Sequence, residues 1–360
     1  MTAATSIDQD ALAAYSFIAW NYKQGQMVTL MIQLGNRLGL YQALDGAGPI
    51  TSAELAERTG LHERWLFERL RGQAAAKLIE YRADADADRF ELTEIGALVL
   101  ARDTAPTYAA AAFDDERPPN YVDRLSGSFR SGLGLTYDDL GPACAHNVGR
   151  MLGPLTKALL VPVVIPALDG VHEKLTSGAE VADVGCGVGV ALEELAAAYP
   201  ASQFVGYDLS RHAIEVGSER LAAAGLANAR LEHRRAEDLP HDGRFDLILT
   251  FDCLHDMTRP DLAIAAIRRA LRPDGTWLAK DIFSTPSFID NMRNPLLPLM
   301  YASSVATCMS SALSEPGGLG LGTLGFNPVV AEQMAREAGF THFVTHDLPD
   351  RANFYYEVKL

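Results

Sequence analysis

The chain has 360 residues, of which 48% are apolar and 21% are charged, so we expect a globular protein of about two domains and exclude disordered and fibrous classes. Acidic residues outnumber basic ones and give a net charge of −15, which opposes binding to nucleic acids or anionic membranes. Cys144, Cys186, Cys253 and Cys308 are far apart and share no metal-binding spacing. With no basic, cleavable leader in view, we expect a soluble cytoplasmic protein.

Residues 1–104 are predicted to be mainly helical. Apolar side chains recur at helical spacing from Val28 to Leu38, and Gly39 ends that helix. Two more helices and two short strands follow, at 53–58, 62–76, 78–81 and 89–92. Three helices followed by a hairpin are typical of a winged-helix domain.

A winged helix raises the question of DNA binding, which the charges disfavour. Between Met27 and Asp103 there are nine basic and twelve acidic residues. In the third helix, Trp65 and Phe67 are expected to be buried rather than to enter a groove. The acidic tip of the hairpin, 84–88, is interpreted as a solvated turn and not as a metal site.

A proline-rich helical linker is predicted at 105–172, with a kinked helix over 152–168 and no role assigned to single residues. From residue 173 the pattern alternates between strands and helices. The predicted strands are 180–184, 203–207, 230–235, 246–250, 276–282, 342–347 and 354–360. This order indicates an α/β domain over 173–360, with a seven-stranded, mostly parallel sheet covered by helices on both faces.

A glycine-rich loop directly after the first of these strands is the strongest functional signal. Its candidate ligand-binding residues are Asp183, Gly185, Cys186, Gly187 and Gly189. A dinucleotide site would need glycine at position 190, which is valine, so the spacing favours a nucleoside without a pyrophosphate. Asp208, followed by Leu209, ends the second strand, where a carboxylate can accept both ribose hydroxyls. Glu237 and Asp238 follow the third strand, in position for an adenine amino group.

From Glu180 to its end, the chain resembles class I S-adenosylmethionine-dependent methyltransferases, most specifically over Phe245–Asp256 and Leu271–Gly275. With the winged helix, it resembles bacterial small-molecule methyltransferases whose N-terminal domain dimerises. The resemblance implies S-adenosylmethionine as cofactor, S-adenosylhomocysteine as product and a homodimer. It also implies that Asp183 and the glycine loop hold the methionine part, Asp208 the ribose, and Glu237 or Asp238 the adenine amine. Phe251 and Asp252 would then lie on the far side, near the sulfonium.

His255 is the candidate catalytic residue, because a histidine can accept a proton from a hydroxyl near neutral pH. Plant-type O-methyltransferases resemble this sequence at the same His-Asp pair and use the histidine as a general base. The alternative is that His255 caps the next helix or binds the cofactor. Asp256 is interpreted as a cap or an orienting partner. The predicted reaction is methyl transfer to a small molecule, most readily at oxygen.

Two alternative functions remain open. Related C-methyltransferases of α-keto acids bind iron or zinc through a His-Asp pair and a second histidine, but Thr307 stands where that histidine is expected, so we predict no metal. A cofactor-sensing winged-helix transcription regulator is the other alternative. Residues 283–324 form an apolar insertion that predicts a substrate pocket, a dimer interface or plain core; its candidate pocket residues are Phe283, Met300, Tyr301 and Met309.

Overall fold

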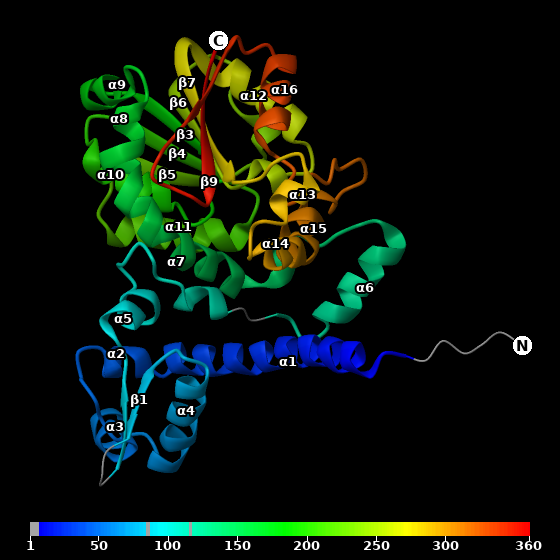
Figure 1. Cartoon of the computed structure of the whole chain (residues 1–360). Helices are drawn as coiled ribbons and strands as arrows, with labels where there is room; N and C mark the ends of the chain where they lie inside the picture. Colours follow the sequence, from blue (N-terminus) through cyan, green and yellow to red (C-terminus); the bar gives the residue numbers. More distant parts are fainter. Residues whose placement is uncertain (1–6, 84–86, 115–116) are drawn as a thin grey trace, which may run out of the picture. The chain divides into compact units, whose positions relative to one another are not determined.

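The computed structural model describes residues 7–83, 87–114 and 117–360, and it divides the chain into two compact units, Met1–Asp114 and Asp115–Leu360. Figure 1 shows both units coloured along the chain. The predicted linker 105–172 does not form a third unit, because its first ten residues belong to the first unit and the rest to the second. Part of the acidic hairpin tip, at 84–86, lies outside the described residues.

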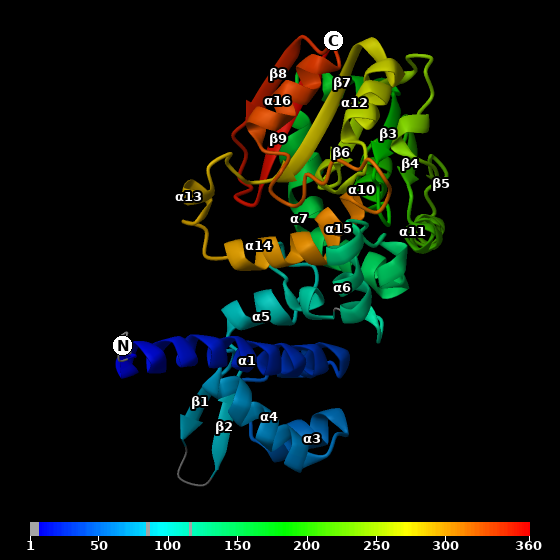
Figure 2. The same ribbon diagram turned by 90° about the vertical axis from the view of Figure 1, so that its right-hand side faces the viewer.

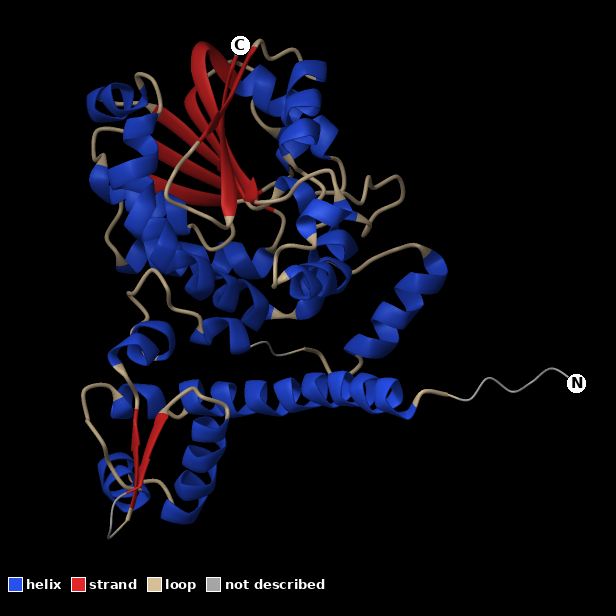
Figure 3. Cartoon of the chain, viewed as in Figure 1, coloured by secondary structure: helices blue, strands red, loops and turns tan. Residues whose placement is uncertain are grey.

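The first unit is a helical domain with one antiparallel hairpin (Figure 3), which confirms the predicted winged helix. Its elements are α1 (Gln9–Arg37), α2 (Leu40–Leu44), α3 (Ser52–Thr59), α4 (Glu63–Ala75), β1 (Glu80–Ala83), β2 (Asp88–Glu91), α5 (Glu94–Leu100) and a 3₁₀ turn, Ala110–Phe113. Thr51 and Glu54 form a capping box at the start of α3. Gly39 separates α1 from α2 with a left-handed φ of 66°, which explains why the first helix ends there.

Helix α1 is longer than predicted. It begins at Gln9, and the Asp8 carboxylate caps it by accepting the backbone N–H groups of Asp10 and Ala11. The apolar run from Ala11 to Trp20 therefore belongs to the same helix. The helical pattern was visible only after Val28 because burial is confined to that end of α1, at Ile32 and Gly35.

Helix α4 corrects one sequence expectation. Its buried residues, Leu66, Arg69, Leu70 and Gln73, share one face at spacings of three and four. Trp65 lies off that face and is 80% exposed, so the prediction that it is buried was wrong.

The second unit is built on a seven-stranded sheet with the order β5-β4-β3-β6-β7-β9-β8. Its strands are β3 (Glu180–Val184), β4 (Gln203–Asp208), β5 (Ala229–His233), β6 (Phe245–Phe251), β7 (Leu271–Ile282), β8 (His342–His346) and β9 (Asn353–Lys359). β9 runs antiparallel to both of its neighbours, β7 and β8, and the other neighbouring strands of this sheet are parallel to each other. All seven predicted strands are present, and the predicted fold class is confirmed. The order in which strands are added to the sheet reverses at β3: β4 and β5 lie on one side of it, and β6 and β7 lie on the other. Parallel sheets of this kind bind ligands at such a switch point.

Helices cover both faces of this sheet (Figures 1 and 2). One core contains residues of α8 (Ile165–Ala167), α9 (Val171–Ser177) and α10 (Val190–Ala198), and the other contains residues of α12 (Pro260–Ala270) and α16 (Pro328–Glu337). The remaining helices are α6 (Tyr121–Ser131), α7 (Pro142–Leu159), α11 (Arg211–Ala223), α13 (Phe288–Asn291), α14 (Leu297–Ser303) and α15 (Met309–Ala312). Short 3₁₀ turns span Asp138–Leu140, Ala236–Asp238 and Leu254–Asp256, and π-helical turns span Leu160–Val164 and Ser304–Cys308.

The helical stretch Pro142–Ala167 is the one segment of the described chain whose length and mean hydropathy, 1.5, would suit a membrane span. A third of it is buried inside the protein. In the structure α7 contacts α10 and α11, so this stretch packs on the sheet domain. Pro154 lies inside α7, within the predicted helix 152–168, and the π-helical turn Leu160–Val164 follows it.

Candidate active site

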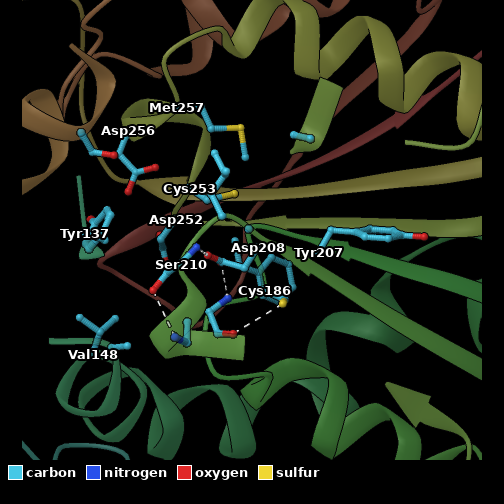
Figure 4. Close-up of a pocket in the computed structure, with 18 of the residues that line it drawn as sticks. Tyr137, Val148, Cys186, Tyr207, Asp208, Ser210, Asp252, Cys253, Asp256 and Met257 are labelled. Atoms are coloured by element: carbon cyan, nitrogen blue, oxygen red, sulfur yellow. Dashed lines mark hydrogen bonds between the residues drawn. The ribbon is translucent and has the colours of Figure 1, made fainter. Parts of the chain in front are cut away.

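A cavity of about 370 Å³ lies at the carboxyl ends of β3, β4, β5 and β6 (Figure 4). It brings together most of the predicted cofactor residues: Asp183, Gly185, Cys186, Gly187, Asp208, Leu209, Glu237, Phe251 and Asp252. Two predicted residues do not line it. Gly189 instead provides the left-handed N-cap of α10, and Asp238 is exposed to solvent while Glu237 faces the cavity. Of the two candidate acceptors for the adenine amine, Glu237 lines the cavity and Asp238 does not, although both belong to the turn Ala236–Asp238.

The glycine loop is fixed by Asp208. One carboxylate oxygen of Asp208 accepts the backbone N–H of Gly187 at 2.8 Å, and the other accepts that of Ser210, also at 2.8 Å. Gly185 adopts a left-handed φ of 72°, and an added Cβ there would approach the Cβ of Cys253 to 2.6 Å, so only glycine fits. Burial raises the pKa of Asp208, and the two N–H groups oppose that rise.

Asp183 forms part of the cavity wall. Its side chain is almost fully buried, and among the described residues its Oδ1 atom has no hydrogen-bond partner. Burial, and then the Asp208 carboxylate, raise its pKa to about 8, although Lys280 acts in the opposite direction. A buried carboxylate oxygen without a partner is energetically costly unless a ligand donates to it.

Asp252 is held by two side chains that the sequence analysis did not identify. It adopts a left-handed φ of 52°, the Lys280 ammonium lies 2.5 Å from its Oδ2, and the Asn353 amide donates to its Oδ1 at 2.5 Å. Lys280 also lines the cavity and lies 5.4 Å from the ring centroid of Phe251. A lysine in the middle of an apolar strand was a visible signal, because a buried cation needs a partner.

His255 is buried. It is 2% exposed, it does not line the cavity, and its Nδ1 atom lies 2.6 Å from Oδ1 of Asp281. The insertion covers it, since the Gly322 N–H donates to the His255 carbonyl at 2.9 Å and Cys308 forms a hydrogen bond with the imidazole. Burial disfavours the charged ring, but the Asp281 carboxylate outweighs this effect and raises the pKa of His255 well above its usual range.

Asp256 lines the cavity, unlike its sequence neighbour His255. Its carboxylate accepts a hydrogen bond from the Tyr137 hydroxyl, and Figure 4 shows both side chains at the same end of the cavity. Burial raises the pKa of Asp256 to about 7, against the opposing effect of His255.

The region before the sheet supplies a wall that sequence reasoning missed. Tyr137 and Asp138 line the cavity, and Asp138 accepts the Ser210 hydroxyl at 2.5 Å. The α7 residues that line it are Ala145, Val148, Gly149, Leu152 and Thr156. Their spacing of three and four residues is a helical periodicity that could have identified this face.

The predicted substrate residues of the insertion do not line this cavity. Phe283 stacks on Phe354 with ring centroids 4.5 Å apart, and Tyr301 lies exposed with its ring centroid 6.0 Å from that of Phe288. Met300 and Met309 are partly buried elsewhere in the insertion. The insertion reaches the cavity through Ser311 of α15 and through Ser314 and Glu315, which follow that helix.

The expected third metal ligand is also absent from its position. The Thr307 hydroxyl donates to the Ser303 carbonyl at 2.7 Å. Within residues 7–83, 87–114 and 117–360, no group of three or more His, Cys, Asp or Glu side chains is arranged to hold a metal ion.

Part of each unit matches a known protein-family model. Residues 175–312 match the family described as "Methyltransferase domain", and residues 26–102 match the "Rv2258c-like winged HTH domain". Among curated relatives, the ubiquinone biosynthesis O-methyltransferase of Thiobacillus denitrificans is 30% identical over 165 residues, 45% of this chain and 65% of that protein. An uncharacterized protein of Rickettsia prowazekii, RP028, is 33% identical over 140 residues, 38% of this chain and 54% of that protein. The chain therefore spans between half and two thirds of the length of these relatives.

Solved structures extend the likeness over both units at the level of fold. Human N-acetylserotonin methyltransferase in complex with S-adenosylmethionine superposes with a TM-score of 0.67 at 18% identity, covering 99% of each chain. The mitomycin 7-O-methyltransferase MmcR gives 0.68 at 19% identity, covering 98% of this chain and 99% of its own. The chain thus carries a methyltransferase domain of the class I fold behind an Rv2258c-like winged helix-turn-helix domain.

Proposed function

We propose that the protein transfers a methyl group from S-adenosylmethionine to a small molecule, at a hydroxyl oxygen. The observation that carries this proposal is a single cavity that joins three carboxylates, Asp183, Asp208 and Glu237, from three successive strand ends. Asp183 has a buried oxygen without a partner, and the cavity volume is that of a nucleoside-sized ligand. The donor groups of the cofactor, an ammonium, two ribose hydroxyls and an adenine amine, complement these three acceptors.

Each carboxylate has a distinct binding role in this proposal. Asp183 and the loop 183–189 hold the amino-acid end, Asp208 accepts the ribose hydroxyls with the lone pairs left beside its two N–H bonds, and Glu237 accepts the adenine amine. Phe251 and the Asp252–Lys280 pair form the far wall. When bound, S-adenosylmethionine supplies an electrophilic methyl group.

His255 is proposed as the general base. Asp281 accepts the Nδ1 proton at 2.6 Å, which leaves Nε2 as the atom that can take the hydroxyl proton of the acceptor. The ring is buried, so an acceptor reaches it only when Cys308 and the insertion give way. Asp281 raises the pKa of His255, so the neutral ring, which is the form that can accept a proton, becomes populated as pH rises.

We further propose a homodimer formed through the first unit, and a cytoplasmic location. The N-terminal half of α1 exposes large apolar side chains, including Tyr15, Phe17, Trp20 and Tyr22. An apolar surface of this kind is typical of a protein interface. All four cysteines are free thiols, in keeping with a reducing compartment.

The test combines binding and turnover. S-adenosylhomocysteine should raise the melting temperature and NAD should not, because only a ligand of the folded state stabilises it. Asp208→Ala should abolish most of that shift, whereas Asp242→Ala, which removes an exposed carboxylate paired with Arg244, should keep it. Methyl transfer from labelled S-adenosylmethionine is then measured on matched phenols and anilines. Absence of a shift would refute the cofactor assignment, and a preference for anilines would refute O-methylation.

A further inference from the structure

An ion-paired cluster stands at the adenine end of the cavity. Arg235 and Glu237 come from the turn after β5, and Glu315 comes from the insertion after α15. All three line the cavity. The Arg235 guanidinium binds Glu315 through two parallel contacts, Nη1 to Oε1 at 2.7 Å and Nη2 to Oε2 at 2.9 Å.

Glu237 forms a longer ion pair with the same guanidinium. Its Oε1 lies 3.4 Å from Nη2 of Arg235, longer than either contact to Glu315. Two carboxylates thus compete for one arginine, and the bidentate geometry gives Glu315 the stronger interaction. Because Glu237 lines the cavity and a carboxylate has about four acceptor sites, one long contact leaves it able to accept a further donor.

We propose that Glu315 is a positioning residue for cofactor selectivity: its two contacts to Arg235 limit the guanidinium to one long contact with Glu237, so that the Glu237 carboxylate stays available to an exocyclic purine amine. The inference rests on the proposed function, because it takes the ligand of this cavity to be an adenosyl group. It adds a determinant that belongs to the insertion and not to the nucleoside-binding strands. The adenine end is therefore completed only when the insertion is in place.

Removing the Glu315 charge frees Arg235. In Glu315→Gln, a shift of the guanidinium by less than about 1 Å would bring it to an ordinary charge-assisted hydrogen-bond distance from Glu237, roughly 2.8 Å. A purine amine must then compete with a cation for the same oxygens. We expect the hydrogen bond from the amine to the Glu237 carboxylate to be weakened but not lost, which corresponds to about a three- to tenfold change in Kd.

Calorimetric titration with two probes tests this reasoning. The probes are S-adenosylhomocysteine and its analogue in which hydrogen replaces the 6-amino group. For Glu315→Gln we expect the Kd of S-adenosylhomocysteine to rise about three- to tenfold and the Kd of the analogue to stay unchanged. The double variant Arg235→Gln/Glu315→Gln should recover affinity for S-adenosylhomocysteine, because the competing cation is gone. The matched control is Glu332→Gln, which removes a similarly exposed Glu–Arg pair on α16.

The outcomes separate the two proposals. If both probes weaken equally in Glu315→Gln, the residue acts as a latch on the insertion and the selectivity proposal is wrong. If the double variant binds no better than Glu315→Gln, competition by Arg235 is refuted. If the unmodified protein binds neither probe, the proposed function itself fails. Melting curves of each variant establish that it is folded.

Discussion

Replacing Asp183 by asparagine should stabilise the unliganded protein, and by an amount that depends on pH. Burial and the Asp208 carboxylate raise the pKa of Asp183 to about 8, from an ordinary value of 3.8. Between these two values the folded chain binds a proton that the unfolded chain releases. The stability of the wild type therefore falls as pH rises through this window. At pH 7 the cost is on the order of 4 kcal/mol, and asparagine, which does not ionise, is free of it.

Guanidinium unfolding of both proteins at pH 5, 6, 7 and 8 measures this effect. The free energy of unfolding of Asp183→Asn should exceed that of the wild type by a margin that grows with pH and levels off above pH 8. Asp242→Asn serves as the control, because Asp242 is exposed and Arg244 lowers its pKa. A margin that does not change between pH 5 and 8 would show that Asp183 is ionised in the folded protein and would refute the reasoning.

The ligand should reverse the penalty. A cationic amino group binds ionised Asp183, so the affinity for S-adenosylhomocysteine should rise from pH 6 to 8 and binding should release a proton. Titrations in buffers of different ionisation enthalpy detect that proton. Asp183→Asn should bind more weakly and without this pH dependence.

Further expectations concern catalysis, the thiol and assembly. His255→Ala should lower kcat about 10²–10⁴-fold with little effect on cofactor affinity, and Asp281→Asn should move the rising limb of the pH–rate profile to lower pH; an unmoved limb would exclude His255 as the titrating base. Burial opposes ionisation of Cys308, but the hydrogen bond from His255 lowers its pKa, so iodoacetamide at pH 7 should label Cys308 before the other cysteines, and His255→Ala should remove the preference. Light scattering should give a dimer mass for the wild type and a smaller mass for Trp20→Asp; a monomeric wild type would contradict the proposed interface.

The central strands were predictable from sequence because β3, β4 and β6 are short, buried apolar runs, and glycine or acidic residues follow them at their carboxyl ends. The loop 183–189 and Asp208 follow from that pattern alone. The contacts of Asp252 could not be placed in advance, because both depend on long-range strand pairing: that of Lys280 on how β7 pairs with β6, and that of Asn353 on how β9 pairs with β7.

A second kind of error came from predicting the burial of a side chain from its residue type alone. Trp65 was expected to be buried because it is large and apolar, yet its position on α4 lies off the buried face. The insertion was interpreted as a substrate pocket, a dimer interface or plain core, and its aromatic and methionine side chains do not line the cavity. It reaches the cavity through Ser311, at the end of α15, and through Ser314 and Glu315, where the chain after α15 meets Arg235 of the turn after β5.

Successive residues of β7 serve opposite sides of the sheet: Lys280 contacts Asp252, and Asp281 contacts His255. Their register is set by β6 on one side, where Phe251 pairs with Lys280, and by the last strand on the other, where Lys280 pairs with Tyr355 and Asp281 with Phe354; the last strand also contributes Asn353 to Asp252. The final eight residues thus act as a template for two separate parts of the site. Trimming the C-terminus, or fusing a bulky tag directly to Leu360, should damage cofactor binding and proton transfer together, although neither part lies at the end of the chain.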